Sequence, residues 1–176
     1  MRIRKFAAIA AVLLSSAGLP RCGSRKVTQG NQPPSAASVT PSSGSGPSQV
    51  FSYLFSDPDG SADIAAAQML IQATLSPANS CYMHFEPATS RLWLTNDSGV
   101  GSTGPITLGG SGTLQNSQCI VDAVGSSSSA SGNNLTVNVA LTFKPAFSGA
   151  KANFMAVSDT LNQTPGWQAR GNWTVP

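Results

Sequence analysis

Two cysteines, Cys81 and Cys119, carry the most specific chemistry in this sequence. Each lies in a segment that alternates apolar and polar residues, so each is expected on a β-strand. The amino-terminal residues have the features of an export signal, which places the protein in an oxidising compartment. We therefore predict a disulfide between Cys81 and Cys119. In the chain-entropy model it would stabilise the fold by about 3–4 kcal/mol.

Three carboxylates occur together on one turn, and oxygen ligands so close in sequence suit a hard cation such as calcium: Asp57, Asp59 and Asp63. The position of Gly60, and Gln68 where a glutamate would be needed, exclude an EF-hand loop. The favoured interpretation is a turn in which Asp57 and Asp63 accept hydrogen bonds from backbone N–H groups. Asp159 could add a ligand only if its loop lies at the same end of the fold.

The single histidine, His84, alternates with Tyr82 and Glu86 on one face of an expected strand. As the base of a serine hydrolase it would need a serine and a carboxylate brought to it by the fold. The chain contains no Gly-x-Ser-x-Gly motif. A zinc site would need more His or Cys ligands than remain after the disulfide forms. We therefore interpret His84 as a partly exposed strand residue and keep a small secreted hydrolase as the least favoured alternative.

Aromatic residues offer a different chemistry, since sandwich proteins that bind sugars stack pyranose rings on exposed aromatic side chains. Trp93 alternates with Arg91 and Thr95, so it lies either on the surface or in the core. If exposed, it would form a carbohydrate-binding surface together with Tyr82. Trp167 and Trp173 share the apolar face of one expected strand, and we assign both to the core.

Residues 1–17 are predicted to be a secretory signal peptide, with a basic start, an apolar stretch and a small-residue cleavage site. The apolar stretch is too short to span a bilayer. The net charge is +3. Cleavage removes Arg2, Arg4 and Lys5 and leaves equal numbers of acidic and basic residues. The mature chain therefore has no basic surface for nucleic acid.

Cys22 follows the apolar stretch, where a bacterial lipoprotein carries its acylated cysteine. Arg21 stands immediately before it, although the lipoprotein signal requires a small residue at that position. Lipidation of Cys22 therefore remains an alternative to a free thiol. Residues 18–33 are polar without apolar periodicity and are predicted to be a flexible linker.

The elements that must position these residues are β-strands. The segment 134–143 keeps the alternation expected of a half-buried strand along its whole length. The segment 65–75 fits either a helix or a strand, and we assign a strand from Gln68. Seven to nine short strands separated by turn residues predict that residues 34–176 form an all-β domain, an immunoglobulin-like antiparallel β-sandwich.

Several segments also resemble an immunoglobulin-like module of bacterial secreted and cell-surface proteins: 33–44, 55–60, 81–82, 112–119, 141–145 and 166–176. The similarity extends from about residue 33 to the end. It implies the same fold and an extracellular location. The family has no assigned catalytic activity.

Together these features predict a non-catalytic, monomeric binding or structural module without a cofactor, calcium being the one alternative. The sandwich would present the loops 96–105, 125–134 and 159–166 to a protein or glycan partner. The first rival is a carbohydrate-binding module that uses Trp93 and Tyr82. Fold alone does not decide between these functions, because sandwiches serve many of them.

Overall fold

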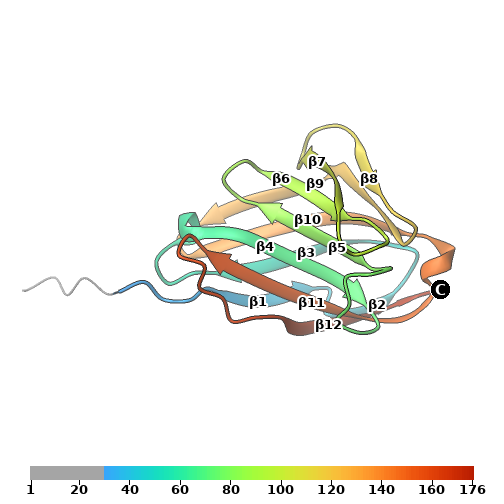
Figure 1. The fold of residues 1–176 in the computed structure, drawn as a ribbon, viewed down its shortest axis with the longest axis horizontal. Coiled ribbons are helices and arrows are strands. Elements are labelled where there is room, and N and C mark those ends of the chain that lie inside the picture. The colour runs from blue at the N-terminus through green and yellow to red at the C-terminus, as the bar shows by residue number, and fades with distance from the viewer. Residues whose placement is uncertain (1–29) are drawn as a thin grey trace, which may run out of the picture. The chain divides into compact units, whose positions relative to one another are not determined.

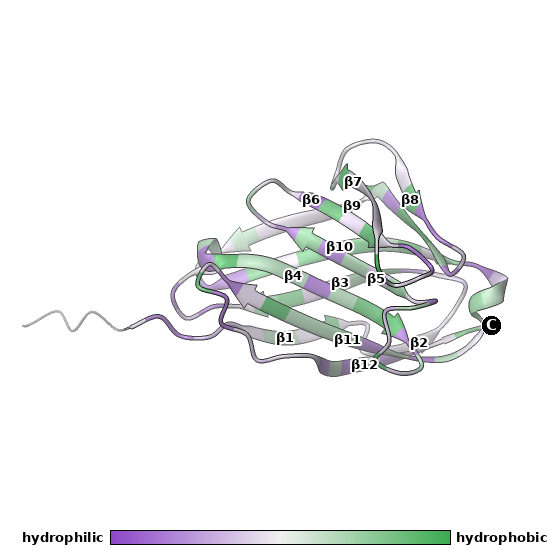
Figure 2. Ribbon diagram, in the orientation of Figure 1, coloured by the Kyte–Doolittle hydropathy of each residue, from purple (hydrophilic) through white to green (hydrophobic). Residues whose placement is uncertain are grey.

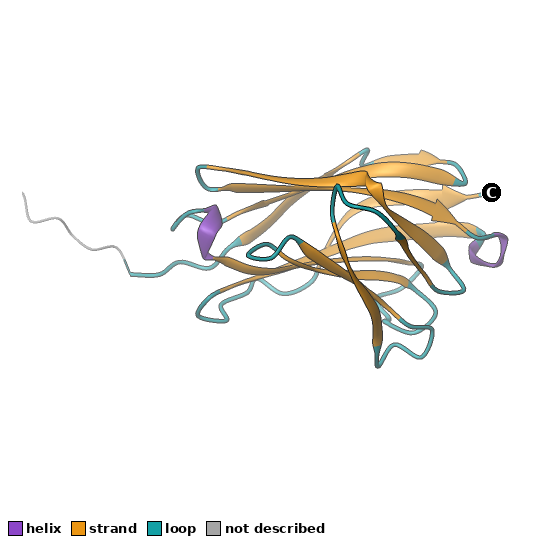
Figure 3. Cartoon of the chain, turned by 90° about the horizontal axis from the view of Figure 1, so that it is seen from above, coloured by secondary structure: helices purple, strands orange, loops and turns teal. Residues whose placement is uncertain are grey.

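The computed structural model describes residues 30–176, which form two β-sheets packed face to face (Figures 1 and 3). The predicted signal peptide (1–17), the lipidation candidate Cys22 and the predicted linker before residue 30 lie outside the described residues. No helix among residues 30–176 is long and apolar enough to cross a membrane.

The first sheet has five strands in the order β1-β3-β10-β9-β8, and every neighbouring pair is antiparallel. Its strands are β1 (Ser35–Thr40), β3 (Ser48–Ser56), β10 (Asn134–Phe143), β9 (Cys119–Ser131) and β8 (Thr113–Gln115). The short 3₁₀ turn η2 (Pro145–Phe147) follows β10.

The second sheet has seven strands in the order β2-β12-β11-β4-β5-β6-β7. Its strands are β2 (Ser43–Ser45), β12 (Gln168–Val175), β11 (Gly149–Asp159), β4 (Ile64–Gln72), β5 (Cys81–Glu86), β6 (Arg91–Thr95) and β7 (Ser102–Thr107). All neighbours are antiparallel except β2, which pairs parallel with β12. A 3₁₀ turn, η1 (Ser61–Asp63), connects β3 in the first sheet to β4 in the second.

Part of each sheet follows the order of the immunoglobulin variable type: β1-β3-β10-β9 corresponds to strands A, B, E and D, and β12-β11-β4-β5-β6 corresponds to strands G, F, C, C′ and C″. The strands β8, β2 and β7 are additional. The prediction of an all-β, immunoglobulin-like antiparallel sandwich is thus confirmed. The twelve strands exceed the predicted seven to nine. The strands that the sequence did not reveal are β2 and β8, whose three residues each are too few to show an alternating pattern.

The core lies between the sheets and follows from the alternation of apolar residues, which Figure 2 shows as bands of colour along the strands. In β3 the buried residues are Phe51, Tyr53 and Phe55, while the residues between them are partly exposed. The Tyr53 hydroxyl donates a hydrogen bond of 3.0 Å to Asn153 Oδ1 of β11, in the opposite sheet. Both partners are buried, so this bond links the two layers through the core.

Three predictions of secondary structure were wrong in extent. The serine-rich segment 125–134 is not a loop, because residues up to Ser131 continue β9 and pair with β10. Only Gly132 and Asn133 turn the chain there. The expected loop 96–105 ends at residue 101, because β7 begins at Ser102. The strand assigned from Gln68 instead begins at Ile64. In each case pairing with a neighbouring strand overrides the local sequence preference.

The predicted disulfide between Cys81 and Cys119 is present. It joins β5 of the seven-stranded sheet to β9 of the five-stranded sheet, and both cysteines are fully buried. The bond therefore ties the two layers together. Its position differs from the inter-sheet bond between strands B and F in antibody domains.

Asp97 reinforces the region around this bond. Its carboxylate accepts hydrogen bonds from the Ser117 N–H at 3.0 Å and from the Ser117 hydroxyl at 2.6 Å. Both bonds favour the ionised form, so they lower the pKa of Asp97 below its ordinary value. The backbone carbonyl of Asp97 also accepts the N–H of Asn79.

We expect Asp97→Asn to lower the free energy of unfolding at neutral pH by about 1 kcal/mol, because it weakens two charge-assisted hydrogen bonds. A carboxylate with a lowered pKa stabilises the fold above its ordinary pKa and loses that effect as the pH falls through the folded-state pKa. Urea unfolding of both proteins at neutral and at strongly acidic pH checks this. An equal difference at both pH values would contradict the assigned role.

Candidate functional site

The outer face of the seven-stranded sheet carries a group of rings, which we call the aromatic face: Tyr82, His84, Trp93, Phe154 and Trp167. All five side chains are partly exposed. The core-facing neighbours in β5, Met83 and Phe85, are fully buried, so alternation places Tyr82 and His84 on the side away from the core. Of the two positions left open for Trp93, the structure shows the surface one, because Leu92 and Leu94 beside it are buried and Trp93 is partly exposed.

Strand register places these residues in two rows across the sheet. In one row Phe154 of β11 lies opposite Leu70 of β4, which lies opposite Tyr82 of β5. In the other row Gln68 of β4 lies opposite His84, which lies opposite Trp93 of β6. Because neighbouring strands are about 4.8 Å apart, side chains in one row contact each other. Residues far apart in the sequence therefore form one surface.

Leu70 shows that the rings pack closely. It points away from the core, and yet only 1% of its surface is exposed. It is also absent from the main core cluster, so the side chains that bury it belong to the outer face. In this strand Met69 and Ile71 are buried while Gln68 and Gln72 are partly exposed, so Leu70 is an apolar residue on the otherwise polar side. Its cover of aromatic rings explains why an apolar residue stands there.

The prediction that Trp167 lies in the core with Trp173 was wrong for Trp167. Trp173 is buried, whereas Trp167 is partly exposed and precedes β12. A β-bulge causes the difference: Asn153 pairs with Gly171, but Phe154 pairs with Ala169, so one extra residue enters β12. One inserted residue reverses which face every preceding side chain takes. Trp167 therefore lies on the outer face.

The rings meet at an angle rather than in one plane. Trp167 and Tyr82 have ring centroids 5.5 Å apart and an edge-to-face angle of 71°. His84 and Trp93 have centroids 5.9 Å apart at 58°. These distances and angles are the ones that aromatic pairs prefer, so the rings hold one another in place. The result is a surface built from two pairs of mutually inclined rings.

Polar groups accompany the rings. The Tyr82 hydroxyl donates a hydrogen bond of 2.8 Å to Gln68 Oε1. Burial lowers the pKa of His84, with Glu86 acting in the opposite direction, and the lowered pKa favours the neutral imidazole. His84 thus lies against Trp93, and no hydrogen bond joins it to a serine among residues 30–176.

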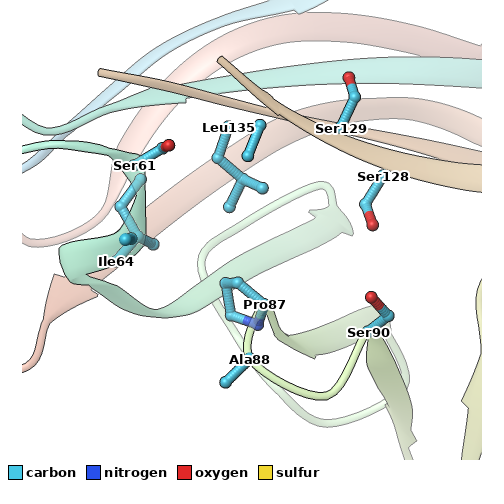
Figure 4. Close-up of a pocket in the computed structure, with 10 residues that line it drawn as sticks. Ser61, Ile64, Pro87, Ala88, Ser90, Ser128, Ser129 and Leu135 are labelled. Atoms are coloured by element: carbon cyan, nitrogen blue, oxygen red, sulfur yellow. The ribbon is translucent and has the colours of Figure 1, made fainter. Parts of the chain in front are cut away.

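A cleft of about 410 Å³ lies away from the aromatic face (Figure 4). Three segments enclose it: η1 and the start of β4, the turn between β5 and β6, and the β9–β10 hairpin. Its walls include Leu135, Ile64 and Pro87, together with serine hydroxyls. None of the residues that line it is titratable: Ser61, Ala62, Ile64, Pro87, Ala88, Ser90, Ser128, Ser129, Ala130 and Leu135. The cleft therefore offers hydrogen bonds to a ligand but no lining group that could act as a general acid or base.

The three carboxylates of the 57–63 turn are brought together, as the sequence indicated. One oxygen of each of Asp57, Asp59 and Asp63 lies within 4.8 Å of the others. The expected turn is present at Asp57, whose Oδ1 accepts the N–H of Asp59 at 2.8 Å. Asp63 instead accepts a hydrogen bond from the Thr160 hydroxyl.

Asp159 lies at the same end, because the Thr160 N–H bonds to the Asp63 carbonyl at 2.9 Å. Its own oxygens already accept hydrogen bonds from the N–H groups of Leu161 and Gln163 and from the amide of Asn31. Asp159 is therefore a structural residue of its loop.

The fold and the aromatic face together define an immunoglobulin-like β-sandwich with a ring-covered outer sheet. No family model, no curated protein and no solved structure matches this chain.

Proposed function

We propose that this protein is a non-catalytic extracellular binding module and that its aromatic face binds neutral carbohydrate. One observation carries the proposal: five rings from four separate segments converge on the outer face of one sheet, where they are partly exposed. The outer face of a sheet needs no aromatic residues for folding, since polar side chains suffice there. Exposed clusters of this kind occur at binding sites.

Carbohydrate suits this surface better than a charged ligand does. A sugar ring has apolar C–H faces, which stack on aromatic rings, and hydroxyl groups, which need nearby hydrogen-bond partners. The aromatic face supplies both kinds of group, with Tyr82, Trp93 and Trp167 as rings and Gln68 and His84 as polar partners. The lowered pKa of His84 favours the uncharged imidazole, which suits a neutral ligand.

The extracellular location is supported by two features of different kinds. The buried disulfide between Cys81 and Cys119 requires an oxidising environment to form and persist. Residues 1–17 have the composition of an export signal.

The proposal is tested by affinity electrophoresis in gels containing hydroxyethylcellulose, xylan or galactomannan. We expect at least one polysaccharide to retard the protein, and Trp93→Ala to weaken the interaction about tenfold, because a stacking ring contributes on the order of 1.4 kcal/mol. Quenching of tryptophan fluorescence during titration gives the affinity independently.

Val124→Ala is the matched control, since Val124 lies on the outer face of the other sheet and is 71% exposed. It removes surface apolar area without touching a ring, so its binding should equal that of the wild type. Equal weakening by the two substitutions, or no retardation of the wild type by any of the three polysaccharides, would contradict the proposal.

A further inference from the structure

We propose that Asp57, Asp59 and Asp63 form a calcium-binding site at the end of the sandwich where β3 passes through η1 into β4 (Figure 1). The site shares no residue with the aromatic face, so the inference goes beyond the proposed function and does not depend on it.

The arrangement of the carboxylates suits calcium. One oxygen from each of the three side chains lies within 4.8 Å of the others. These oxygens are close enough for one ion to contact all three. Calcium binds oxygen at about 2.3–2.6 Å in flexible geometry, whereas magnesium binds at about 2.0–2.1 Å, requires near-ideal octahedral geometry and gives up its water reluctantly. Three carboxylates on one irregular turn therefore suit calcium better than magnesium.

A second, independent observation points to a cation. Asp57 is 0% exposed, and its Oδ2 is the one buried side-chain nitrogen or oxygen atom among the described residues without a hydrogen-bond partner. Its other oxygen, Oδ1, already accepts the N–H of Asp59. Buried polar atoms are nearly always paired, because an unpaired one loses its hydration without compensation. A bound cation would supply the missing partner of Oδ2.

The charges around Asp57 act in the same direction. Burial raises the pKa of Asp57, the backbone N–H of Asp59 opposes this, and the neighbouring carboxylates Asp63, Asp59 and Asp159 raise the pKa further. Within residues 30–176, no basic side chain is among the groups that act on it. A divalent cation would relieve the repulsion between these acidic groups.

The other two side chains each keep an oxygen free for the ion. Asp59 Oδ2 accepts the backbone N–H of Gln32 at 2.6 Å, and Asp63 Oδ1 accepts the Thr160 hydroxyl. These bonds orient the carboxylates and occupy one oxygen of each. Calcium takes six to eight oxygen ligands, so water would complete the coordination.

Calcium at this position would stabilise several segments at once. The Asp57 N–H bonds to the Asn133 carbonyl and the Ser61 N–H to the Gly132 carbonyl, each at 2.9 Å, so the acidic turn is attached to the β9–β10 hairpin. Thr160 connects it to the loop after β11, and Gln32 connects it to the segment before β1. An ion that orders the turn therefore also orders its neighbours.

The test is thermal unfolding of the full-length protein, detected by circular dichroism. Bound ions are first removed with EDTA, and Tm is then measured in calcium chloride, in magnesium chloride and in sodium chloride at equal ionic strength. With an affinity in the millimolar range typical of extracellular sites, we expect 10 mM calcium to raise Tm by about 3–6 °C. We expect little effect of magnesium.

Asp57→Asn is the decisive variant, because asparagine keeps the Oδ1 that accepts the Asp59 N–H and replaces only Oδ2. Without calcium this variant should be at least as stable as the wild type, since the repulsion is reduced, and calcium should no longer raise its Tm. Asp63→Asn provides a second variant with the same expected loss of the calcium response if Asp57→Asn does not fold.

Asp122→Asn is the matched control. Asp122 Oδ1 accepts the N–H of Val124 two residues ahead, as Asp57 Oδ1 does for Asp59, but Asp122 lies in β9 outside the cluster. It should keep the full calcium response. The proposal is overturned if calcium does not raise the wild-type Tm, if magnesium raises it equally, or if the Asp57→Asn variant responds as the wild type does.

Discussion

Replacing Phe51 with alanine is expected to lower the free energy of unfolding by about 3–5 kcal/mol, the usual cost of removing a buried phenylalanine ring. Phe51 lies in β3, an interior strand of the five-stranded sheet between β1 and β10, and is 0% exposed. Its ring contacts Trp173 of the other sheet edge to face at a centroid distance of 5.2 Å. It also contacts Phe143 and Tyr53, at 6.4 Å and 6.1 Å.

The large effect on stability follows because Phe51 contacts rings of both sheets. Phe51 joins rings from both sheets, so its loss leaves a cavity that neither sheet can fill without moving toward the other. Urea unfolding followed by far-ultraviolet circular dichroism measures the change without relying on the fluorescence of the neighbouring Trp173.

Val50→Ala is the control, because Val50 immediately precedes Phe51 in the same strand and points outward. Its side chain is 49% exposed. Its substitution should change stability by less than about 0.5 kcal/mol. A similar loss for both substitutions would mean that the observed burial does not describe the folded protein in solution.

Removing the disulfide is expected to have an effect of comparable size. The bonded cysteines are separated by 38 residues. For a closed loop of about this length the chain-entropy model predicts a loss of about 4 kcal/mol. We expect the double variant Cys81→Ala, Cys119→Ala to show this loss in urea unfolding, and reduction of the wild type to produce a similar one.

Two measurements make that prediction decisive. Thiol titration of the denatured wild-type protein should find Cys81 and Cys119 unreactive before reduction and reactive after it. The variant Cys22→Ser removes a cysteine outside the bonded pair and should unfold as the wild type does. An unreduced wild type with reactive Cys81 and Cys119, or a double variant of unchanged stability, would be incompatible with a stabilising bond.

Most of the sandwich could be predicted from the sequence because its strands are amphipathic. Residues 134–143 face the core on one side, so their alternation is strict, and β10 has these bounds. Cys81 and Cys119 were assigned to strands by the same pattern, and the bond between them follows from an oxidising compartment. These inferences depend on local periodicity, which the sequence displays directly.

The missed features depend on contacts between distant segments. Ser127 and Ser128 look like loop residues, but they extend β9 because Asn138 and Val137 of β10 lie opposite them. The face taken by Trp167 depends on a bulge that arises only when β11 and β12 pair. No local pattern contains this information, because a shift of one residue in register changes no residue type.

The two candidate sites also differ in how many of their residues could be recognised from the sequence alone. The acidic turn could be recognised because its three carboxylates are close in sequence. Of the aromatic face, Tyr82 and Trp93 were singled out, whereas Phe154 and Trp167 join it only through the sheet. Leu70 was the one available signal, because an apolar residue on the polar side of a strand indicates that something covers it.

The parallel pairing of β2 with β12 has a consequence for the order in which the domain assembles. Gly44 lies opposite Trp173, and the Trp173 indole N–H donates to the Gly46 carbonyl across 127 residues of sequence. Such a contact requires closure of a very long loop, which slows folding and places sandwiches in the millisecond-to-second range. Until β12 has been synthesised, β2 has no strand to pair with. The seven-stranded sheet is therefore completed only after the ribosome has made nearly the whole domain.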